Sequence, residues 1–350
     1  MFLSEFDFDL PEELIATRPA SPRSSSRLLV ARGENIDDSF VNDLPKFLKS
    51  GDRLVLNDTK VLPARLSGVR NRSVEGNKIA SAKIEVTLLA AKKEQIWSAL
   101  VKPLRKIQLG EKIFFDKNFQ AILVDKINGQ ALLQFNKEGT EFFECLDSLG
   151  VMPLPPYIAS KRQADDNDKL DYQTVFARNL GSVAAPTASL HFDNALLDEI
   201  KNIGVEISFI TLHVGAGTFL PVKDEEIRKH KMHAEYGEIS QQTVDEINKT
   251  KKNGGRIIPV GTTALRLLES AAQSAGKLSD WNGETNIFIY PGFKFKVADG
   301  LMTNFHLPKS TLIMLVSAIM GKETIETIYK HAITHRYRFF SYGDSSLLFP

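Results

Sequence analysis

The sequence has little cysteine and little net charge. Its 350 residues include one cysteine, Cys145, which excludes an intrachain disulfide, a cysteine zinc site and an iron–sulfur cluster held by several cysteines. Cys145 lies in the apolar run FFECL, which indicates a core residue rather than a nucleophile. The formal net charge is +1, whereas a protein that coats nucleic acid is normally far more basic. Any nucleic acid must therefore be held by a local basic surface, or by shape and stacking.

Long apolar runs are also missing. A membrane-spanning helix needs about 18 apolar residues, and the nearest approach is Leu312–Met320, which has the length of a core helix. The N-terminal MFLSEFDFDLPEEL is acidic and lacks the basic start and apolar run of a secretory signal. We therefore expect a cytoplasmic protein without a membrane partner. The composition, 43% hydrophobic and 25% charged, is that of a globular protein, and the length predicts about two domains.

The first half of the chain changes character near Pro63. In residues 1–62, strands are predicted at RLLVA and RLVLND, and helices at EELIA and VNDLPKFLKS. Residues 63–150 contain short predicted strands, with Asn128-Gly129 as a hairpin turn and FFECLDSLG as a closing helix. The strand runs are KIEVTLLA, IWSALV, KIFF, QAILVDKI and QALLQF. This spacing is typical of a small antiparallel barrel or sandwich.

Residues 151–350 return to an α/β pattern. After MPLPPYI comes a polar connector, expected to be an exposed loop, and then helices alternate with strands predicted at VEISFITLHV, RIIPV and NIFIY. Pro259 places RIIPV at a sheet edge or a bulge. We therefore predict a large mixed α/β domain, residues 1–62 and 151–350, that carries an inserted small antiparallel β-barrel domain, residues 63–150.

Polar residues, histidines and glycines are concentrated in stretches 181–193, 211–222, 230–236 and 299–311. Five of the seven histidines fall there: His191, His213, His230, His233 and His306. A histidine in a loop is usually structural or solvated, but this concentration beside glycine loops and Glu235 favours general acid–base work. His230, His233 and Glu235 allow a metal site, yet no further ligand spacing supports one, so no metal is expected.

Two predicted strands run into glycine. Gly215 and Gly217 follow VEISFITLHV, and ligands sit at the carboxyl ends of strands in open α/β sheets. GAGTFL lacks the third glycine of GxGxxG, so a plain tight turn is an equal interpretation. After RIIPV, either Thr262 or Thr263 caps a helix, which is the favoured interpretation, or the helix start binds an anion. Near the C-terminus, HRYRFF interleaves arginine with aromatic residues and is a candidate RNA contact.

Long motifs spread over the whole chain carry a family resemblance. They include LVLNDTKVLPARL, GSVAAPTASLHF, TLHVGAGTF, HKMHAEY, VGTTALRLLES and VADGLMTNFHLPKSTL. The chain closely resembles the S-adenosylmethionine:tRNA ribosyltransferase-isomerases of queuosine biosynthesis, essentially end to end. Ser189 departs from the pattern, because such proteins usually carry glycine there, and this difference bears on the local loop geometry.

The resemblance implies a fold and a reaction. Such enzymes have a mixed α/β domain with an inserted closed barrel. They transfer and isomerise the ribosyl group of S-adenosylmethionine, not its methyl group, onto 7-aminomethyl-7-deazaguanosine at the tRNA wobble position. The products are epoxyqueuosine in the tRNA, adenine and methionine. S-Adenosylmethionine is thus the co-substrate, tRNA is the partner, no metal or redox cofactor is expected, and we expect a monomer.

These expectations assign candidate site residues. The acid–base residues are predicted among His191, His213 and His233, with Glu235 in support. The co-substrate is predicted to lie over Gly215, Gly217 and Thr218, with Thr262 and Thr263 nearby. The modified base and the tRNA are predicted to contact Asp299, Asn304, His306, Arg336 and Arg338.

Two other functions stay open on the residues alone. A methyltransferase that uses the same co-substrate would release S-adenosylhomocysteine instead of adenine, and would usually carry a fuller glycine fingerprint. A non-catalytic RNA-binding module built on the barrel would not need the polar histidine and glycine loops that lie outside it.

Overall fold

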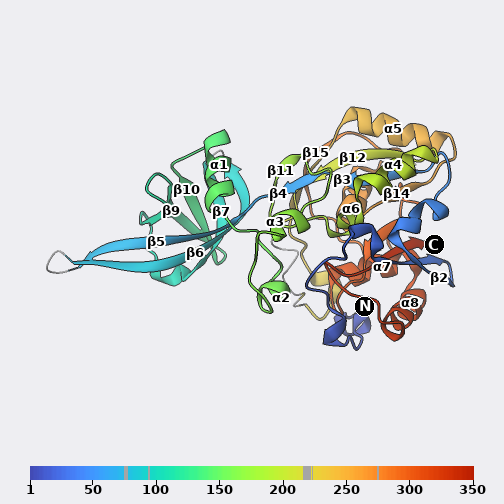
Figure 1. Cartoon of the computed structure of the whole chain (residues 1–350), viewed down its shortest axis with the longest axis horizontal. Helices are drawn as coiled ribbons and strands as arrows, with labels where there is room; N and C mark the ends of the chain where they lie inside the picture. Colours follow the sequence, from blue (N-terminus) through green and yellow to red (C-terminus); the bar gives the residue numbers. More distant parts are fainter. Residues whose placement is uncertain (75–77, 94, 216–221, 223, 274–275) are drawn as a thin grey trace. The chain divides into compact units, whose positions relative to one another are not determined.

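The computed structural model describes residues 1–74, 78–93, 95–215, 222, 224–273 and 276–350, which form two compact units (Figure 1). The first unit comprises Met1–Thr59, Gln173–Asn179 and Ala185–Pro350, and the second Lys60–Tyr172 and Leu180–Ala184. The first is mixed α/β and the second is built on a closed antiparallel barrel. The predicted fold class is therefore confirmed.

The larger sheet of the first unit is mixed. Its order is β14 (Ile257–Pro259), β3 (Arg53–Asn57), β12 (Glu206–Leu212), β13 (Glu235–Ile239) and β15 (Trp281–Thr285). Strands β14, β3 and β12 are parallel, so their carboxyl ends meet at one edge, and β13 and β15 extend the sheet in antiparallel fashion. Pro259 lies on the outer strand, as predicted, where a missing amide costs no ladder hydrogen bond.

A second sheet of the first unit joins the two ends of the chain. Its order is β16 (Leu301–Asn304), β17 (Ser345–Phe349), β1 (Arg27–Arg32) and β2 (Asn35–Phe40). A parallel bridge between Val260 and Met302 links it to the larger sheet. Asn304 therefore lies at the same edge as the carboxyl ends of β14, β3 and β12.

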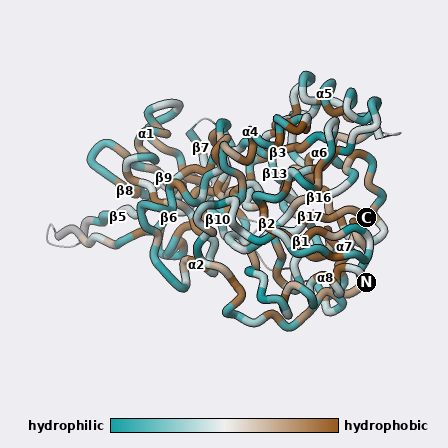
Figure 2. Tube along the Cα trace, turned by 45° about the vertical axis from the view of Figure 1, so that its right-hand side comes forward, coloured by the Kyte–Doolittle hydropathy of each residue, from teal (hydrophilic) through white to brown (hydrophobic). Residues whose placement is uncertain are grey.

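Helices cover both sheets. They are α4 (Asn194–Asn202), α5 (Gln241–Lys252), α6 (Thr262–Ala271), α7 (Thr311–Met320) and α8 (Lys322–Thr334). Asp193 and Ser240 cap α4 and α5 by accepting hydrogen bonds from backbone amides in the first turn. The tube is largely teal along α5, as expected for a surface helix, whereas α7 supplies buried Ile313, Met314 and Leu315 to the core (Figure 2).

The barrel of the second unit closes in the order β10 (Gln130–Phe135), β7 (Ile96–Lys102), β6 (Lys78–Lys93), β5 (Arg65–Val74), β8 (Lys112–Phe114) and β9 (Gln120–Ile127). The predicted turn is present, with Asn128 and Gly129 at φ of 50° and 80°. The predicted closing helix is α1 (Gly139–Leu149), whose Phe142 stacks on Trp97 at 5.3 Å between ring centroids.

Two sequence predictions differ from the structure. The prediction of a strand at NIFIY, residues 286–290, is wrong, because the strand β15 ends just before this segment. The side chains of 287–290 instead pack in the apolar cluster around α7 and α8. The second unit also runs beyond residue 150 to Tyr172, because Val151 pairs with Arg65 of β5 and Tyr172 is fully buried. The connector holds short helices α2 (Pro156–Ala159) and α3 (Asp168–Asp171), and buried Asp168 binds Arg162 at 2.6 Å.

Candidate functional site

Polar side chains collect where the parallel strands end. Asp58 and Thr59 follow β3, His213 follows β12, and Gly261 follows β14. The last residue of β16, Asn304, lies at the same edge. The carboxyl edge of a parallel sheet is where open α/β folds bind ligands. His191 and Glu235, which contact Asn304 and the Gly215 amide, lie beside these residues, so each of the four predicted polar stretches contributes a residue to this part of the first unit.

Asn57 ties β3 to β12 at this edge. Its side-chain oxygen accepts the Leu212 amide at 3.0 Å and the Thr59 amide at 3.2 Å, and its side-chain nitrogen donates to the Leu212 carbonyl at 2.9 Å. The same nitrogen lies 3.4 Å from the hydroxyl of Thr263. Asn57 is fully buried, and its side-chain amide satisfies backbone groups at the ends of both strands. These hydrogen bonds fix the two strand ends relative to each other.

Asp58 is a second organising residue that sequence patterns missed. Its buried carboxylate accepts hydrogen bonds from Thr211 at 2.7 Å and Asn179 at 3.1 Å, and pairs with Arg178 at 3.0 Å. The Arg178 guanidinium also lies 4.6 Å from the centroid of the Phe209 ring. These contacts hold the end of segment 173–179 against β12. The only sequence signal was that Asn57, Asp58 and Thr59 occur in a motif of the family resemblance.

His213 has the geometry of a proton acceptor. Its Nδ1 lies 2.8 Å from the Thr59 hydroxyl, and its ring lies parallel to that of Tyr236 at 6.2 Å between centroids. Within the described residues Nε2 has no hydrogen-bond partner, and the side chain is half-buried. Burial lowers the pKa of His213, while the nearby carboxylates of Glu238 and Asp58 oppose this shift. A largely neutral imidazole with an open nitrogen can accept a proton.

Glu235 holds the start of the glycine segment. Its Oε2 accepts a hydrogen bond from Arg266 of α6 at 2.6 Å, and its Oε1 accepts the Gly215 amide at 3.2 Å. Both charged side chains are buried. Within the described residues, Nε and one terminal nitrogen of Arg266 are buried without a hydrogen-bond partner, which leaves donors for an anionic group. Gly217 and Thr218, predicted beside Gly215, lie outside the described residues.

His191 is enclosed by a hydrogen-bond chain. Its Nδ1 lies 2.7 Å from the Ser26 hydroxyl, which itself donates to the Arg23 carbonyl, so the proton resides on Nδ1. Its Nε2 then accepts from Asn304 at 3.2 Å, and Asn304 accepts from Thr187 at 3.0 Å. Burial lowers the pKa of His191 to about 4. Both nitrogens are occupied, so in this arrangement His191 positions Asn304.

Two further predicted residues are buried in the same region. His306 lies beyond β16, with Nε2 3.2 Å from the Thr303 hydroxyl, and burial lowers the pKa of His306 to about 3. Its backbone amide donates to the Tyr329 hydroxyl at 3.0 Å. Ser189, the departure from the family pattern, lies in the 3₁₀ segment η6 (Thr187–His191) and is fully buried. Its hydroxyl has no hydrogen-bond partner within the part of the chain that the structure describes.

The start of α6 departs from the sequence expectation. Thr262 and Thr263 are its first two residues, and the residue in the cap position is Gly261 at φ of 92°. The interpretation that a threonine caps this helix is therefore wrong, because the chain needs a glycine to turn from β14 into α6. The alternative interpretation, an anion at the helix start, remains a prediction.

Other predicted residues are not gathered at the polar edge. His233 is exposed on the segment before β13. Asp299 accepts the Ile257 amide at 2.8 Å, which places it at the amino end of β14, opposite the edge where Gly261 lies. Arg336 is exposed, and its nearest carboxylate is Glu13 at 4.0 Å. Arg338 is held by Asp344 at 3.0 Å.

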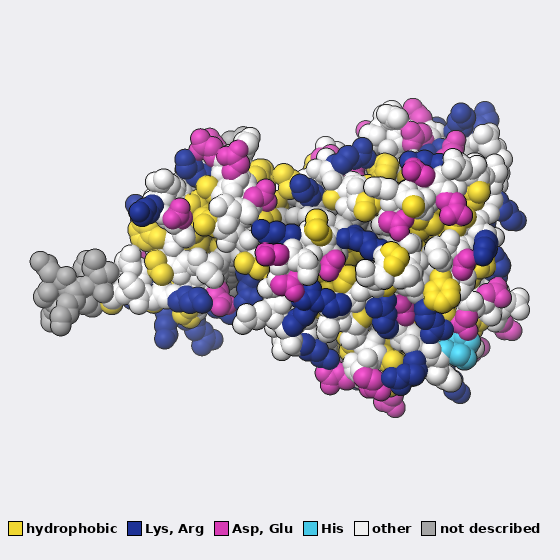
Figure 3. Space-filling view, in the orientation of Figure 1, with side chains coloured by type: hydrophobic (Ala, Val, Ile, Leu, Met, Phe, Trp, Pro, Cys, Tyr) yellow, Lys and Arg dark blue, Asp and Glu magenta, His cyan; other side chains and the backbone are white. Residues whose placement is uncertain are grey.

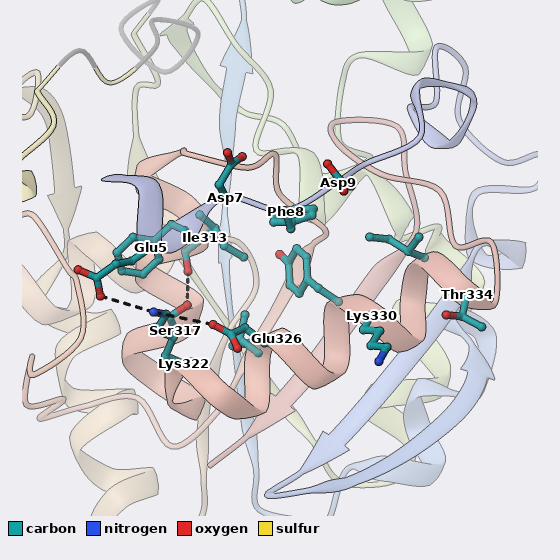
Figure 4. Close-up of a pocket in the computed structure, with 14 residues that line it drawn as sticks. Glu5, Asp7, Phe8, Asp9, Ile313, Ser317, Lys322, Glu326, Lys330 and Thr334 are labelled. Carbon is teal, nitrogen blue, oxygen red and sulfur yellow. Dashed lines mark hydrogen bonds and ion pairs between the residues drawn. The ribbon is translucent and has the colours of Figure 1, made fainter. Parts of the chain in front are cut away.

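A separate apolar cavity of about 310 Å³ lies between the N-terminal segment and helices α7 and α8 (Figure 4). Ile313 and Phe8 contribute apolar surface, and Glu5, Lys322 and Glu326 form ion pairs at its rim. The lining includes none of the predicted site residues among those described. Tyr329, which lines it, is the residue that accepts the His306 amide.

The fold and the polar edge define a class of protein: an α/β enzyme with its buried polar groups at the carboxyl ends of parallel strands and a barrel inserted after the first of them. Residues 3–348 match the family described as queuosine biosynthesis protein, and the chain belongs to this family. None of its described helices is long and apolar enough to cross a membrane.

Relatives named S-adenosylmethionine:tRNA ribosyltransferase-isomerase match over the full length. The protein from Ruegeria pomeroyi is 62% identical over 351 residues, covering 100% of both chains, and that from Roseobacter denitrificans is 61% identical, covering 100% of this chain and 99% of its own. The crystal structure of S-adenosylmethionine tRNA ribosyltransferase from Thermotoga maritima has a TM-score of 0.55 and 33% identity, covering 98% of this chain and 99% of that one.

Proposed function

We propose that this enzyme transfers and isomerises the ribosyl group of S-adenosylmethionine onto 7-aminomethyl-7-deazaguanosine at the wobble position of tRNA. The products are epoxyqueuosine-tRNA, adenine and methionine. The observation that carries the proposal is the 62% identity across the whole chain to a protein named for this activity. The buried polar edge of the first unit supports it with a proton acceptor, ordered amides and an arginine with donors that have no partner among the described residues.

The chemistry requires proton transfers rather than oxidation or reduction. The positive sulfur of S-adenosylmethionine acidifies the neighbouring 5′ C–H and makes methionine a good leaving group. A base removes that proton, the sugar opens as adenine departs with a proton, the aminomethyl nitrogen attacks, and an oxygen displaces methionine to close the epoxide. His213 is our candidate base, because it combines an open Nε2 with partial exposure and a lowered pKa.

The other residues of the edge take supporting roles in this proposal. Glu235 orders Gly215, and the co-substrate lies over the glycine segment that begins there. The carboxylate of the methionine moiety suits the amides at the start of α6 and the two Arg266 nitrogens that have no partner in the described part of the chain. His191 orients Asn304 toward the sugar or the modified base. Glu235 and His191 thus act through their neighbours.

The RNA partner is held locally. The wobble base lies in a single-stranded loop, and such bases can be extruded and read on their edges. Lysine and arginine are interspersed with aspartate and glutamate over the face in view, which therefore carries no broad basic patch (Figure 3). In our proposal, a few local contacts hold the tRNA loop instead. Arg336 is exposed and suits a phosphate contact, whereas Arg338 is paired with Asp344 and suits positioning. We propose a cytoplasmic monomer without a metal or redox cofactor in the reaction.

Mass spectrometry of precursor tRNA incubated with S-adenosylmethionine tests the proposal. The wobble nucleoside should gain the rearranged pentose, with adenine and methionine released in equal amounts. Formation of S-adenosylhomocysteine and a methylated base would establish a methyltransferase instead. Binding of tRNA without any turnover, retained by the isolated barrel, would establish an RNA-binding module.

A further inference from the structure

Outside the polar edge, metal-binding side chains meet at the end of α8. His331 is on the last turn of α8, His335 ends the helix, and Asp38 lies on β2, 293 residues before His331. One ligand atom from each residue lies within 4.8 Å of the other two, a grouping that holds within the described part of the chain. We propose that Asp38, His331 and His335 bind a divalent transition metal ion such as Zn²⁺ or Ni²⁺.

The two histidines have the spacing and orientation of ligands. Residues four apart lie on one face of a helix, and the two rings are stacked with centroids 3.9 Å apart. His335 Nδ1 lies 2.9 Å from the His331 carbonyl and donates its proton to it. The lone pair of His335 is therefore on Nε2, and the ring is oriented by the kind of carbonyl bond that metal-bound histidines usually make through their other nitrogen.

Both oxygens of the Asp38 carboxylate have partners, and both face His331. Oδ1 accepts a hydrogen bond from Tyr337, and Arg27 lies 3.7 Å from the same oxygen. His331 Nε2 lies 3.0 Å from Oδ2 and 3.2 Å from Oδ1. Tetrahedral coordination with bonds of about 2.0 Å separates neighbouring ligand atoms by about 3.3 Å. A small rotation of the side chains is therefore enough to place an ion between His331 and Asp38, in exchange for the imidazole proton.

The donor set selects the class of ion. Two imidazoles and one carboxylate suit zinc, nickel, cobalt or copper, whereas Mg²⁺ and Ca²⁺ prefer an all-oxygen shell. The His331 and Asp38 side chains are 24% and 37% exposed, so water can complete the coordination. Arg27 opposes a second positive charge, but its guanidinium is engaged by the His335 carbonyl at 2.6 Å and lies 3.6 Å from the centroid of the Tyr337 ring.

The consequence of this site is structural. An ion here would tie the C-terminal helix α8 to the β1–β2 hairpin at the start of the chain. It would also fix His335, the residue before Arg336. The site lies outside the polar edge, so the ion stabilises the first unit and takes no part in the proposed sugar transfer.

Equilibrium dialysis of the untagged full-length protein against ZnCl₂ tests the proposal, with the absorption spectrum of bound Co²⁺ as a report on coordination. The wild type should bind one saturable ion per chain, and MgCl₂ should not compete. His335→Gln, at an exposed position that folding tolerates, should weaken zinc binding at least tenfold, and so should His331→Ala. His230→Ala is the matched control, because His230 also lies beside a carboxylate, Asp224 at 3.6 Å, and should leave affinity unchanged.

The outcomes are distinct. Loss of binding in His335→Gln with wild-type circular dichroism supports the site. Unchanged zinc affinity in His335→Gln and His331→Ala, or no saturation in the wild type, overturns it. Loss of affinity in His230→Ala alone overturns it as well, since the bound ion would then lie elsewhere.

Discussion

The carboxylate of Glu235 lies 2.6 Å from a guanidinium nitrogen of Arg266, and both side chains are buried. This pair joins β13 to α6 and, through the Gly215 amide, fixes the start of the glycine segment that follows β12. Breaking a buried pair from one side leaves an uncompensated charge, which costs about 3–5 kcal/mol. Glu235→Ala should therefore lower the free energy of unfolding by that amount in urea titrations. Glu238→Ala, exposed on the same strand, is the control and should change stability little; equal losses in both variants would refute this role.

His213 should control the rate of the chemical step. Removing a general base typically lowers the rate by about 10²–10⁴-fold. We expect His213→Ala to show this loss in single-turnover assays with saturating tRNA and co-substrate, and to keep a native circular dichroism spectrum. Burial lowers the pKa of His213 below the ordinary histidine value of about 6.5, so the imidazole is mostly neutral at pH 6.5. The wild-type rate should therefore fall only at lower pH. A wild-type rate in His213→Ala would remove it from the mechanism.

His191 should make stability depend on pH. The folded state binds its proton only near pH 4, whereas the unfolded chain binds one near pH 6.5. The unfolded state therefore holds more protons between these values, and stability should fall by about 3 kcal/mol as the pH falls from 6.5 to 4. His306 adds a second contribution of the same sign. Urea titrations of His191→Asn should show a clearly shallower slope in this window; an unchanged slope would contradict the buried neutral imidazole.

The barrel and the parallel strands could be predicted because their signals are local. Turn residues, apolar runs and strand spacing locate β7, β8, β9 and β10 within a few residues, whereas the barrel strand β5 was not predicted. NIFIY misleads for the same reason: its apolar residues show that it is buried, but not whether another strand pairs with it. Asp299 lies in a polar stretch, yet only the register of β14 shows that it is at the amino end.

The organising residues of the polar edge could not be found from sequence patterns. Asp58 contacts Thr211, 153 residues away, and Thr59 contacts His213, 154 residues away. An Asn-Asp-Thr run after a strand looks like an ordinary turn. Its role comes from the pairing of β3 with β12, two strands far apart in the sequence. A hydrophobic pattern within one segment does not show which strands pair. The presence of histidines in these loops was a better guide to the site than the turn residues were. It did not show that His213 is partly exposed whereas His191 is buried.

Two fully buried serines offer a matched pair of substitutions. Ser26 accepts the His191 Nδ1 proton, so Ser26→Ala leaves a buried donor unpaired and should cost about 1–3 kcal/mol. The Ser189 hydroxyl has no partner among the described residues, so Ser189→Ala removes an unpaired group and should leave stability equal or higher. Thermal unfolding of both variants measures the difference. A Ser189→Ala variant that is less stable than Ser26→Ala would contradict these assignments.

Arg336 should contribute to tRNA affinity through charge alone. It is exposed, its nearest carboxylate is 4.0 Å away, and a residue that neutralises one phosphate releases about one counterion. Arg336→Ala should weaken tRNA binding and reduce the slope of log K against log salt by about 1, without changing protein stability. Lys46→Ala is the control, because Lys46 is equally exposed but paired with Asp43 at 2.6 Å, outside the predicted RNA contact. If both variants lower the slope equally, or neither does, the C-terminal HRYR run is not the phosphate contact.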